Sequence, residues 1–427
     1  MKLFTNKKAF YILWSGQSLS LLGSGLTRFA LMIWAFQNND SITSMVLLGF
    51  FSSLAFMLVS PFAGVLTDRF NRKWVMLFAD LGSGIITIIL LILSINGILQ
   101  LWHLYLAAGL SGAFEAFQSP AFFSSVSQLV PKEEFTRSNA LIGLSKSAVQ
   151  VFAPVLSSAV LTFGGINLVM MIDLSTLLLG VTALVLIKVK KPEQSETGIL
   201  AAGNFWHEFR FGFRYIFSQP GLRVILLNFV GINLFAGFTY MSILSPMILT
   251  RTGGDKIALG TIQTIMGIGG IIGALVLIAW HAPRKKASMF AWSTLISFGI
   301  CDLLTASSRN VLSWSVSGFL SEFSIPFIVN PYYAIWQEVV PTDVQGRVFS
   351  VREMIQTSPS PLGFLLGGLL ADYVFEPVFL RPTFLTPLVG MEPGSGMAAM
   401  FLITGLFGAL NGLVAVIHPA VKKLDLK

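Results

Sequence analysis

Charged residues are scarce in this chain of 427 residues, at 11% of the sequence, against roughly 25% in an ordinary soluble domain. Hydrophobic residues make up 54% of it, and 37 of them are phenylalanines. A soluble protein this apolar could not cover its surface with polar groups, so much of its hydrophobic area must face lipid. The composition therefore excludes a soluble globular domain and predicts an integral membrane protein.

Cysteine and histidine are almost missing as well. The single cysteine, Cys301, excludes a disulfide framework and a cysteine-based metal site. The four histidines are scattered near the ends of apolar runs, so we expect no metal centre. The glycine-rich run 267–273 has no Walker lysine and lies inside an apolar stretch, which indicates helix packing rather than nucleotide binding. We therefore expect no cofactor.

Apolar runs long enough to cross a bilayer recur about twelve times, each near or above the ~20 residues that a spanning helix needs. The first run is too long for the apolar region of a signal peptide and is interpreted as a span. We expect an all-α integral membrane protein. Its predicted spans are 10–36, 44–66, 74–95, 102–128, 138–163, 167–187, 222–249, 257–280, 288–306, 311–338, 348–375 and 397–417.

The basic residues, which give a net charge of +8, lie in short clusters between the apolar runs and not in one nucleic-acid-binding patch. An even number of spans puts both termini on one side, and nearly all the clusters lie on that side. The opposite loops contain only Arg251, Lys256, Arg309 and Arg381. The positive-inside rule therefore predicts cytoplasmic termini for a protein of the inner (plasma) membrane.

A polar linker divides the predicted spans into two groups of six. The segment 205–217 within it has Arg210 and Arg214 on one flank of a helix that is otherwise aromatic. Its apolar face would consist of Phe205, Phe209, Phe213 and Ile216. Such an amphipathic helix is expected to lie on the anionic cytoplasmic leaflet, with membrane lipids bound by the two arginines. The expected parts are a half at 1–189, a linker at 190–220 and a half at 221–427.

The two halves repeat at a nearly constant spacing of about 210 residues. Pro120 near the end of span four recurs as Pro331 near the end of span ten, and Pro154 of span five recurs as Pro361 of span eleven. Pro154 and Pro361 are expected to bend their helices. The repeat predicts two pseudo-symmetric six-helix halves with a substrate site between them.

The loop after the second span, residues 64–73, reads GVLTDRFNRK. It resembles the signature between helices two and three of the major facilitator superfamily, with Asn71 where the family prefers glycine. Asparagine and glycine both tolerate a left-handed turn. The stretch from Pro120 to 140 and the terminal segment 422–427 resemble the branch of the macrolide efflux pumps and the enterobactin exporter, of the drug:H⁺ antiporter type. The resemblance covers the whole chain.

This resemblance implies rocker-switch alternating access, with helices one, four, seven and ten around the cavity. It also implies a latch that closes the cytoplasmic side, with the start of span eleven near Arg347 as its partner. A solvated loop would explain the basic residues of the motif but not Asp68, whose carboxylate suits the positive N-terminal end of a helix. The candidate gate residues are Gly64, Asp68, Arg69, Arg72 and Lys73. The corresponding turn, 280–285, has no acid, so the latch would be one-sided.

Ionisable residues inside predicted spans are candidates for proton coupling or substrate contact. Arg28, Glu115 and Glu322 lie on helices that the resemblance places around the cavity. A carboxylate there can exchange a proton as access alternates, although a structural Arg28–Glu115 pair is the alternative. Ser111 stands where many antiporters have an arginine, which weakens the usual arginine scheme. Structural pairing is the favoured explanation for Asp80, Asp173, Asp302 and Asp372.

Aromatic and amide residues of spans seven and ten form a candidate cavity wall, with a lipid-facing stripe as the alternative. The candidates are Asn228, Asn233, Phe235, Phe319 and Phe323. Such a wall suits a bulky, amphipathic and even cationic molecule. We expect a monomeric secondary transporter that exports drug-like compounds by proton antiport. The alternatives are an exporter of a natural product, siderophore or lysophospholipid, a membrane-embedded enzyme and a non-transporting sensor.

Overall fold

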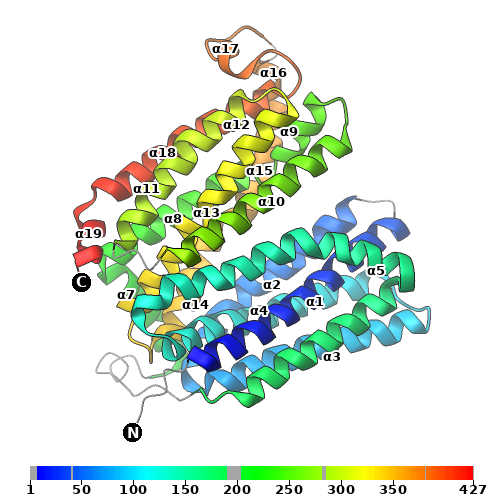
Figure 1. The fold of residues 1–427 in the computed structure, drawn as a ribbon, viewed down its shortest axis with the longest axis vertical. Coiled ribbons are helices and arrows are strands. Elements are labelled where there is room, and N and C mark those ends of the chain that lie inside the picture. Colours follow the sequence, from blue (N-terminus) through cyan, green and yellow to red (C-terminus); the bar gives the residue numbers. More distant parts are fainter. Residues whose placement is uncertain (1–6, 40–41, 190–202, 281–284, 380, 427) are drawn as a thin grey trace. The chain divides into compact units, whose positions relative to one another are not determined.

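The structure is a computed structural model that describes residues 7–39, 42–189, 203–280, 285–379 and 381–426. Its elements in these ranges are helices (Figure 1). The first group is α1 (Lys7–Asn39), α2 (Ile42–Arg69), α3 (Arg72–Ile95), α4 (Leu101–Leu129), η1 (Lys132–Glu134), α5 (Phe135–Leu186) and α7 (Phe205–Ser218). The second group begins with α8 (Pro220–Phe238), α9 (Leu244–Arg251), α10 (Lys256–Ala279), α11 (Lys286–Ile296), η2 (Ser297–Asp302), α12 (Leu303–Ser307) and α13 (Val311–Val339). It ends with α14 (Gln345–Thr357), α15 (Pro359–Leu370), η3 (Ala371–Phe375), α16 (Glu376–Phe379), α17 (Thr386–Val389), α18 (Ser395–Ile417), α19 (Pro419–Lys422) and η4 (Lys423–Leu426).

Ten helical stretches of the described residues are long and apolar enough to cross a membrane. One of them contains α5, whose 52 residues depart from helical backbone angles at Gly165, with φ 64° and ψ −171°. The two arms on either side of Gly165 correspond to predicted spans five and six. The 29-residue α4 is not among the ten, because Glu115, Gln118 and several serines lower its hydropathy. Counting both arms of α5 and adding α4 gives the twelve predicted spans.

Contacts between Cα atoms divide the chain into two compact units. The first unit consists of Met1–Ile216 and Trp336–Met354, and the second of Phe217–Ile335 and Ile355–Lys427. The segment Trp336–Met354 belongs by sequence to the second half of the chain but packs within the first unit. The expected halves at 1–189 and 221–427 follow the sequence repeat, whereas these units follow contacts, and they differ in this segment.

In the first unit, α1 packs along α5, α2 along α4, and α3 between α4 and α5. Small residues allow these helices to approach closely. A Cβ atom added to Gly16, for example, would lie 3.5 Å from the Cα atom of Gly180 on α5. The amide of Gln337 then ties the segment Trp336–Met354 to this bundle. Its Nε2 donates to the carbonyl of Phe123 at 3.1 Å, and its Oε1 accepts from Asn139 at 2.8 Å.

In the second unit, α8 packs against α15 and α18, and α11 packs against α18. A reciprocal pair of asparagines joins α8 to α18. The Nδ2 atom of Asn228 donates to the carbonyl of Asn411 at 2.5 Å, and the Nδ2 atom of Asn411 donates to the carbonyl of Asn228 at 2.8 Å. Because the NH₂ group of each amide donates to a backbone carbonyl of the other helix, the pair fixes the distance between the two helices.

The C-terminal η4 closes one end of the second unit. The carboxylate of Asp425 accepts the backbone N–H groups of Ala287 at 2.7 Å and Ser288 at 2.9 Å. These are unpaired amides in the first turn of α11, where a negative charge is also favoured by the helix dipole. The C-terminal segment therefore anchors the start of α11.

We predict that Gly165→Ala destabilises the protein by about 1–3 kcal/mol, because its backbone region is essentially restricted to glycine. Nothing lies within 4 Å of a Cβ atom added there, so the cost is conformational and not steric. The measurement is the unfolding temperature of the purified protein in detergent. Gly260→Ala is the control, because Gly260 has equally open surroundings in a regular helix. Equal unfolding temperatures for the two variants would contradict the prediction.

Candidate functional site

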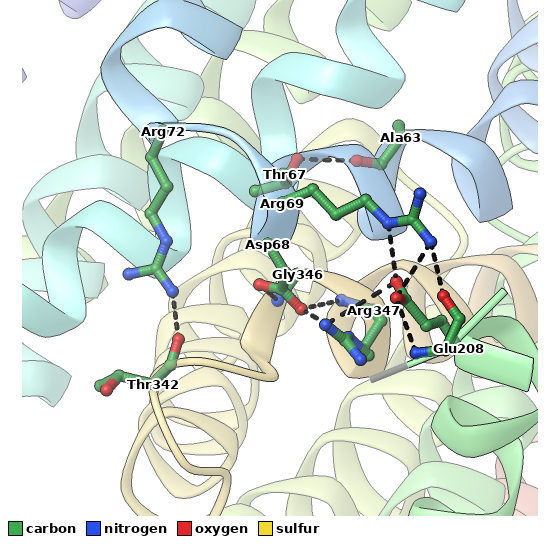
Figure 2. A network of polar contacts seen from close by, with 10 residues as sticks. Ala63, Thr67, Asp68, Arg69, Arg72, Glu208, Thr342, Gly346 and Arg347 are labelled. Carbon is green, nitrogen blue, oxygen red and sulfur yellow. Dashed lines mark hydrogen bonds and ion pairs between the residues drawn. The ribbon is translucent and has the colours of Figure 1, made fainter. Parts of the chain in front are cut away.

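The penultimate residue of α2, Asp68, lies against the N-terminus of α14 (Figure 2). Its Oδ1 atom accepts the backbone N–H of Gly346 at 2.7 Å, and Oδ2 accepts the backbone N–H of Arg347 at 2.9 Å. The Nε atom of Arg347 also donates to Oδ2 at 3.2 Å. The carboxylate therefore accepts hydrogen bonds from two otherwise unpaired amides of α14 and from a guanidinium, and its negative charge is favoured by the dipole of the helix. Its side chain is fully buried, at 0% exposed.

Two glycines bring α2 and α14 close enough for these bonds. A Cβ atom on Gly64 would lie 2.6 Å from the carbonyl oxygen of Gly346, and one on Gly346 would lie 2.7 Å from the carbonyl oxygen of Gly64. Both distances are shorter than real Cβ atoms tolerate. Gly64, one helical turn before Asp68, therefore contributes to the site by having no side chain.

A second carboxylate, Glu208 of α7, extends this network. Its Oε1 and Oε2 atoms accept from Arg69, at 3.0 Å from Nη2 and 3.2 Å from Nε. Its Oε2 atom also lies 3.8 Å from Nη2 of Arg347. The result is a row of alternating charges, Asp68–Arg347–Glu208–Arg69, in which Glu208 is buried between two guanidiniums (Figure 2). Each buried charge has an opposite partner, which limits the cost of desolvation.

The other basic residues of the motif bind backbone carbonyl groups. Arg72 is buried and donates to the carbonyl of Ser124 within α4 at 2.7 Å and to the carbonyl of Thr342 in the turn before α14. Lys73 donates to the carbonyls of Val185 and Ile187 at 2.7 and 2.9 Å, at the end of α5. A cation is favoured at this negative helix end. The predicted basic loop is thus part of the packed structure.

Asn71 does not adopt the left-handed conformation that asparagine and glycine both tolerate. Its φ of −68° and ψ of 123° are extended, and its side chain accepts the backbone N–H of Lys73 at 3.0 Å. It is therefore the N-cap of α3, a position that asparagine favours for its short hydrogen-bonding side chain. Helix α3 begins at the next residue, Arg72.

The sequence analysis missed Glu208, which lies on a face of α7 that is buried against the protein. The buried residues of this helix are Glu208, Gly212 and Ile216. A Cβ atom on Gly212 would lie 2.8 Å from the carbonyl oxygen of Arg347, so this face packs against α14. Phe209 and Phe213 are half-buried, with ring centroids 5.2 Å apart. The available signal in the sequence was that Glu208 is the one acidic residue of a helix that is otherwise aromatic and basic.

Arg210 and Arg214 are exposed on α7. Neither makes an ion pair with another residue in the part of the chain that the structure describes. Trp206 is also exposed, at 62%. An exposed face with an aromatic ring and two cations is typical of interfacial helices. Anionic-lipid binding by these arginines stays a prediction.

The three coupling candidates occupy different environments. Arg28 and Glu115 are exposed, and Glu322 is half-buried. The alternative of a structural Arg28–Glu115 pair is not realised, since no ion pair joins these two described residues. Glu322 has no hydrogen-bond partner among the residues for which a position is described. These carboxylates are therefore not committed to holding helices together.

Two of the carboxylates that we assigned to structural pairing are held by polar side chains. Asp80 accepts from Gln17 at 2.9 Å. Asp173 accepts from Ser24 at 3.1 Å and from Thr87 at 3.2 Å, and both carboxylates are buried. Asp372, in contrast, is exposed. Asp302 has a different environment, described below.

The candidate cavity residues contact neighbouring helices. Asn228 is buried against α18, as described above, and Asn233 donates to the carbonyl of Phe229, four residues earlier, at 3.0 Å. Phe235 packs edge to face on Phe298, with centroids 6.1 Å apart. The rings of Phe319 and Phe323 are stacked at 6.1 Å and half-buried. These three aromatic rings are therefore only partly covered by neighbouring helices.

The two prolines expected to bend helices lie in different settings. Pro154 is half-buried inside α5, whose backbone stays helical until Gly165. Pro361 lies in the first turn of α15, where a missing N–H group removes no helical hydrogen bond. The turn in the second half that corresponds to the gate motif, residues 281–284, lies outside the described residues.

The helical fold, with its long apolar stretches, is that of a multi-pass membrane protein. Residues 13–364 match the family model of the Major Facilitator Superfamily, and the chain belongs to this superfamily. It is therefore a transporter and not an enzyme. Members of this superfamily act on small-molecule substrates. The fold that the resemblance implied is thereby confirmed.

Several known proteins are similar to this chain. Macrolide efflux protein A of Streptococcus pyogenes is 24% identical, over 99% of this chain and 98% of that protein. The multidrug efflux pump Tap of Mycolicibacterium fortuitum is 23% identical, over 95% of this chain and 94% of that protein. A crystal structure of a bacterial homologue of the iron transporter ferroportin, in an outward-facing state, has a TM-score of 0.71. It is 17% identical and covers 95% of this chain and 99% of that one.

We predict that Glu208→Gln loosens α7, because the neutral amide cannot bridge the guanidiniums of Arg69 and Arg347. Hydrogen–deuterium exchange of the amides at 205–218 should become about tenfold faster or more, since hydrogen bonds to charged groups contribute about 1.5–3 kcal/mol. Arg210→Gln is the matched control, because it removes an exposed charge from the same helix. Unchanged exchange in Glu208→Gln, or an equal change in the control, would argue against a bridging role.

Proposed function

We propose that this transporter exports hydrophobic or amphipathic drug-like compounds across the inner membrane, with both termini in the cytoplasm, by proton antiport and rocker-switch alternating access. The observation that carries the proposal is the binding of Asp68 to the first amides of α14. A transporter that alternates between two states needs a closing contact that forms and breaks as a unit. The bonds of Asp68 join one carboxylate to one helix end, so they would form and break together. The names of the two efflux relatives support the outward direction of transport.

The contact is suited to switching because it is made entirely of polar bonds on a short helix end. Asp68 accepts three hydrogen bonds, and hydrogen bonds to a charged group contribute about 1.5–3 kcal/mol each. When the contact opens, water can replace all of these donors, so the net difference between the states stays small. We infer that the two arrangements can therefore interconvert, as alternating access requires.

The substrate class follows from the side chains of the candidate wall. Phe235, Phe319 and Phe323 supply half-buried aromatic surface, which favours a bulky apolar body. Glu322 is one residue before Phe323, and its carboxyl group has no hydrogen-bond partner among the described residues, which favours a substrate with a positive charge. This combination supports an amphipathic substrate, and a strongly anionic one would be disfavoured.

We expect Asp68→Asn to slow efflux by about tenfold or more while the protein remains folded. The neutral side chain of asparagine would bind the backbone amides of α14 and Arg347 more weakly, which would weaken the proposed closure of the cytoplasmic side. Initial efflux rates from proteoliposomes, at matched protein content, measure this. Asp425→Asn is a matched control, because Asp425 also accepts two amides at a helix N-terminus but lies outside the motif. Normal rates in Asp68→Asn, or equal slowing by Asp425→Asn, would refute the gate assignment.

If Glu115 or Glu322 carries the coupling proton, its Gln variant should bind substrate but fail in efflux driven by a pH gradient. Substrate exchange in the absence of a gradient should persist, because it needs no net proton movement. Loss of binding and exchange together would instead indicate a substrate contact. Gradient-driven efflux that survives in the Glu115→Gln, Glu322→Gln double mutant would exclude both residues as proton carriers.

A further inference from the structure

A buried carboxyl group of the second unit takes no part in the network around Asp68. Asp302 is the last residue of η2, a short π-helix within predicted span nine, and it is 1% exposed. Its Oδ1 atom accepts the hydroxyl of Tyr240 at 2.7 Å, and that hydroxyl accepts from Ser321 of α13 at 2.9 Å. The Oδ2 atom is buried and has no hydrogen-bond partner among the described residues.

The surroundings of Asp302 contain no compensating positive charge within the described part of the chain. Its titratable neighbours are Tyr240, in the turn after α8, and the buried Cys301. Helix α18 packs closely against Asp302, since a Cβ atom on Gly405 would lie 2.8 Å from Cβ of Asp302. The sequence of α18 contains no ionisable residue. On α13, Ser321 is followed by Glu322, which is an acid and not a counter-ion.

An ionised carboxylate in this position would be unfavourable. A buried charge without a cation carries a large desolvation cost, and one of its two oxygens would also lack a donor. The neutral acid avoids most of this cost and retains the bond from Tyr240. We therefore infer that Asp302 holds a proton in this conformation, on Oδ2, the oxygen that has no other partner.

The local backbone offers a way to change this environment. π-Helical turns are rare, occur mostly as single insertions in α-helices and are frequent at functional sites. Here the π turn Ser297–Asp302 ends at the carboxyl group itself, and its first residue is tied to α13 by the bond from Ser324 to Ser297 at 2.8 Å. A return to α-helical geometry would rotate Asp302 relative to Tyr240.

We propose that Asp302, Tyr240 and Ser321 form a proton-binding site in which Asp302 carries the coupling proton, a role that rests on the proposed proton antiport. A proton from outside adds to Oδ2 of the carboxylate and gives the neutral acid. After the change in access the same proton leaves to the cytoplasm and the carboxylate is restored. No other bond is made or broken, and one positive charge moves inward as substrate moves outward.

The first test asks whether the acid is protonated and does not depend on transport. The infrared spectrum of the purified full-length protein at neutral pH should contain a carboxylic-acid C=O band that Asp302→Asn removes. Asp425→Asn is the control and should keep the band, because both oxygens of Asp425 accept hydrogen bonds from donors at the start of α11. If the band is unchanged in Asp302→Asn, the site holds no proton and the proposal is overturned.

The second test uses proteoliposomes loaded with radiolabelled erythromycin as the probe. Efflux driven by a pH gradient should fall at least about tenfold in Asp302→Asn, whereas exchange without a gradient should stay within about twofold. Wild-type efflux that does not respond to the gradient would overturn the proposed proton antiport and this role with it. Wild-type efflux that responds, with Asp302→Asn equally active, would overturn only the role of Asp302.

Tyr240→Phe provides a second variant in case Asp302→Asn does not fold, because it keeps the ring and removes only the hydroxyl. The carboxylate loses its one donor in this variant, so the proton should be held more tightly. The pH profile of erythromycin efflux should therefore move to more alkaline values. If the hydroxyl had a purely structural role, its removal would lower the stability and leave the pH profile of efflux unchanged. That result would contradict the proposal.

Discussion

The carboxylate of Asp68 on the first amides of α14 is the interaction on which the rest of the first unit's charged network depends. It fixes Arg347, whose guanidinium then lies within reach of Glu208, and Glu208 in turn binds Arg69. Each pair is favourable because the next opposite charge is already in place, and an isolated member would be a costly buried ion. One segment of the second sequence half, Trp336–Met354, is thereby held within the first unit.

The same physical solution recurs at other helix ends of this protein. The end of a helix exposes unpaired amides or carbonyls, and in an apolar bundle these need a partner other than water. Asn71 supplies one for α3, Lys73 for the end of α5, and Asp425 for α11. Charged residues are few in this chain, and Asp68, Lys73 and Asp425 serve helix ends. Carboxyl groups without such a role, as in Glu322 and Asp302, are therefore the ones available for proton or substrate chemistry.

The membrane spans and the helix end that Asp68 contacts were both predictable from the sequence, but for different reasons. Twelve apolar runs predict twelve helices, because the hydrophobic requirement of a bilayer is a sum over local residues. The approach of Asp68 to the start of α14 near Arg347 came from the resemblance of residues 64–73 to a family signature. No rule of spacing links positions that are 279 residues apart along the chain. The break in α5 at Gly165 lies between predicted spans five and six, whereas Pro154 leaves the backbone helical, as proline can within a membrane helix.

The sequence alone determined the membrane class, the spans, the repeat and the family, since each depends on local composition or on a contiguous motif. Only the tertiary structure identified Glu208 as a bridge between two arginines and Asp302 as a carboxyl group with one oxygen that no described residue contacts by a hydrogen bond. The sequence placed Glu208 on an aromatic helix and Asp302 in an apolar run, and neither setting distinguishes a paired acid from an unpaired one. Burial and pairing are properties of neighbours brought together by folding, so a residue's electrostatic environment is decided by chain segments distant in sequence.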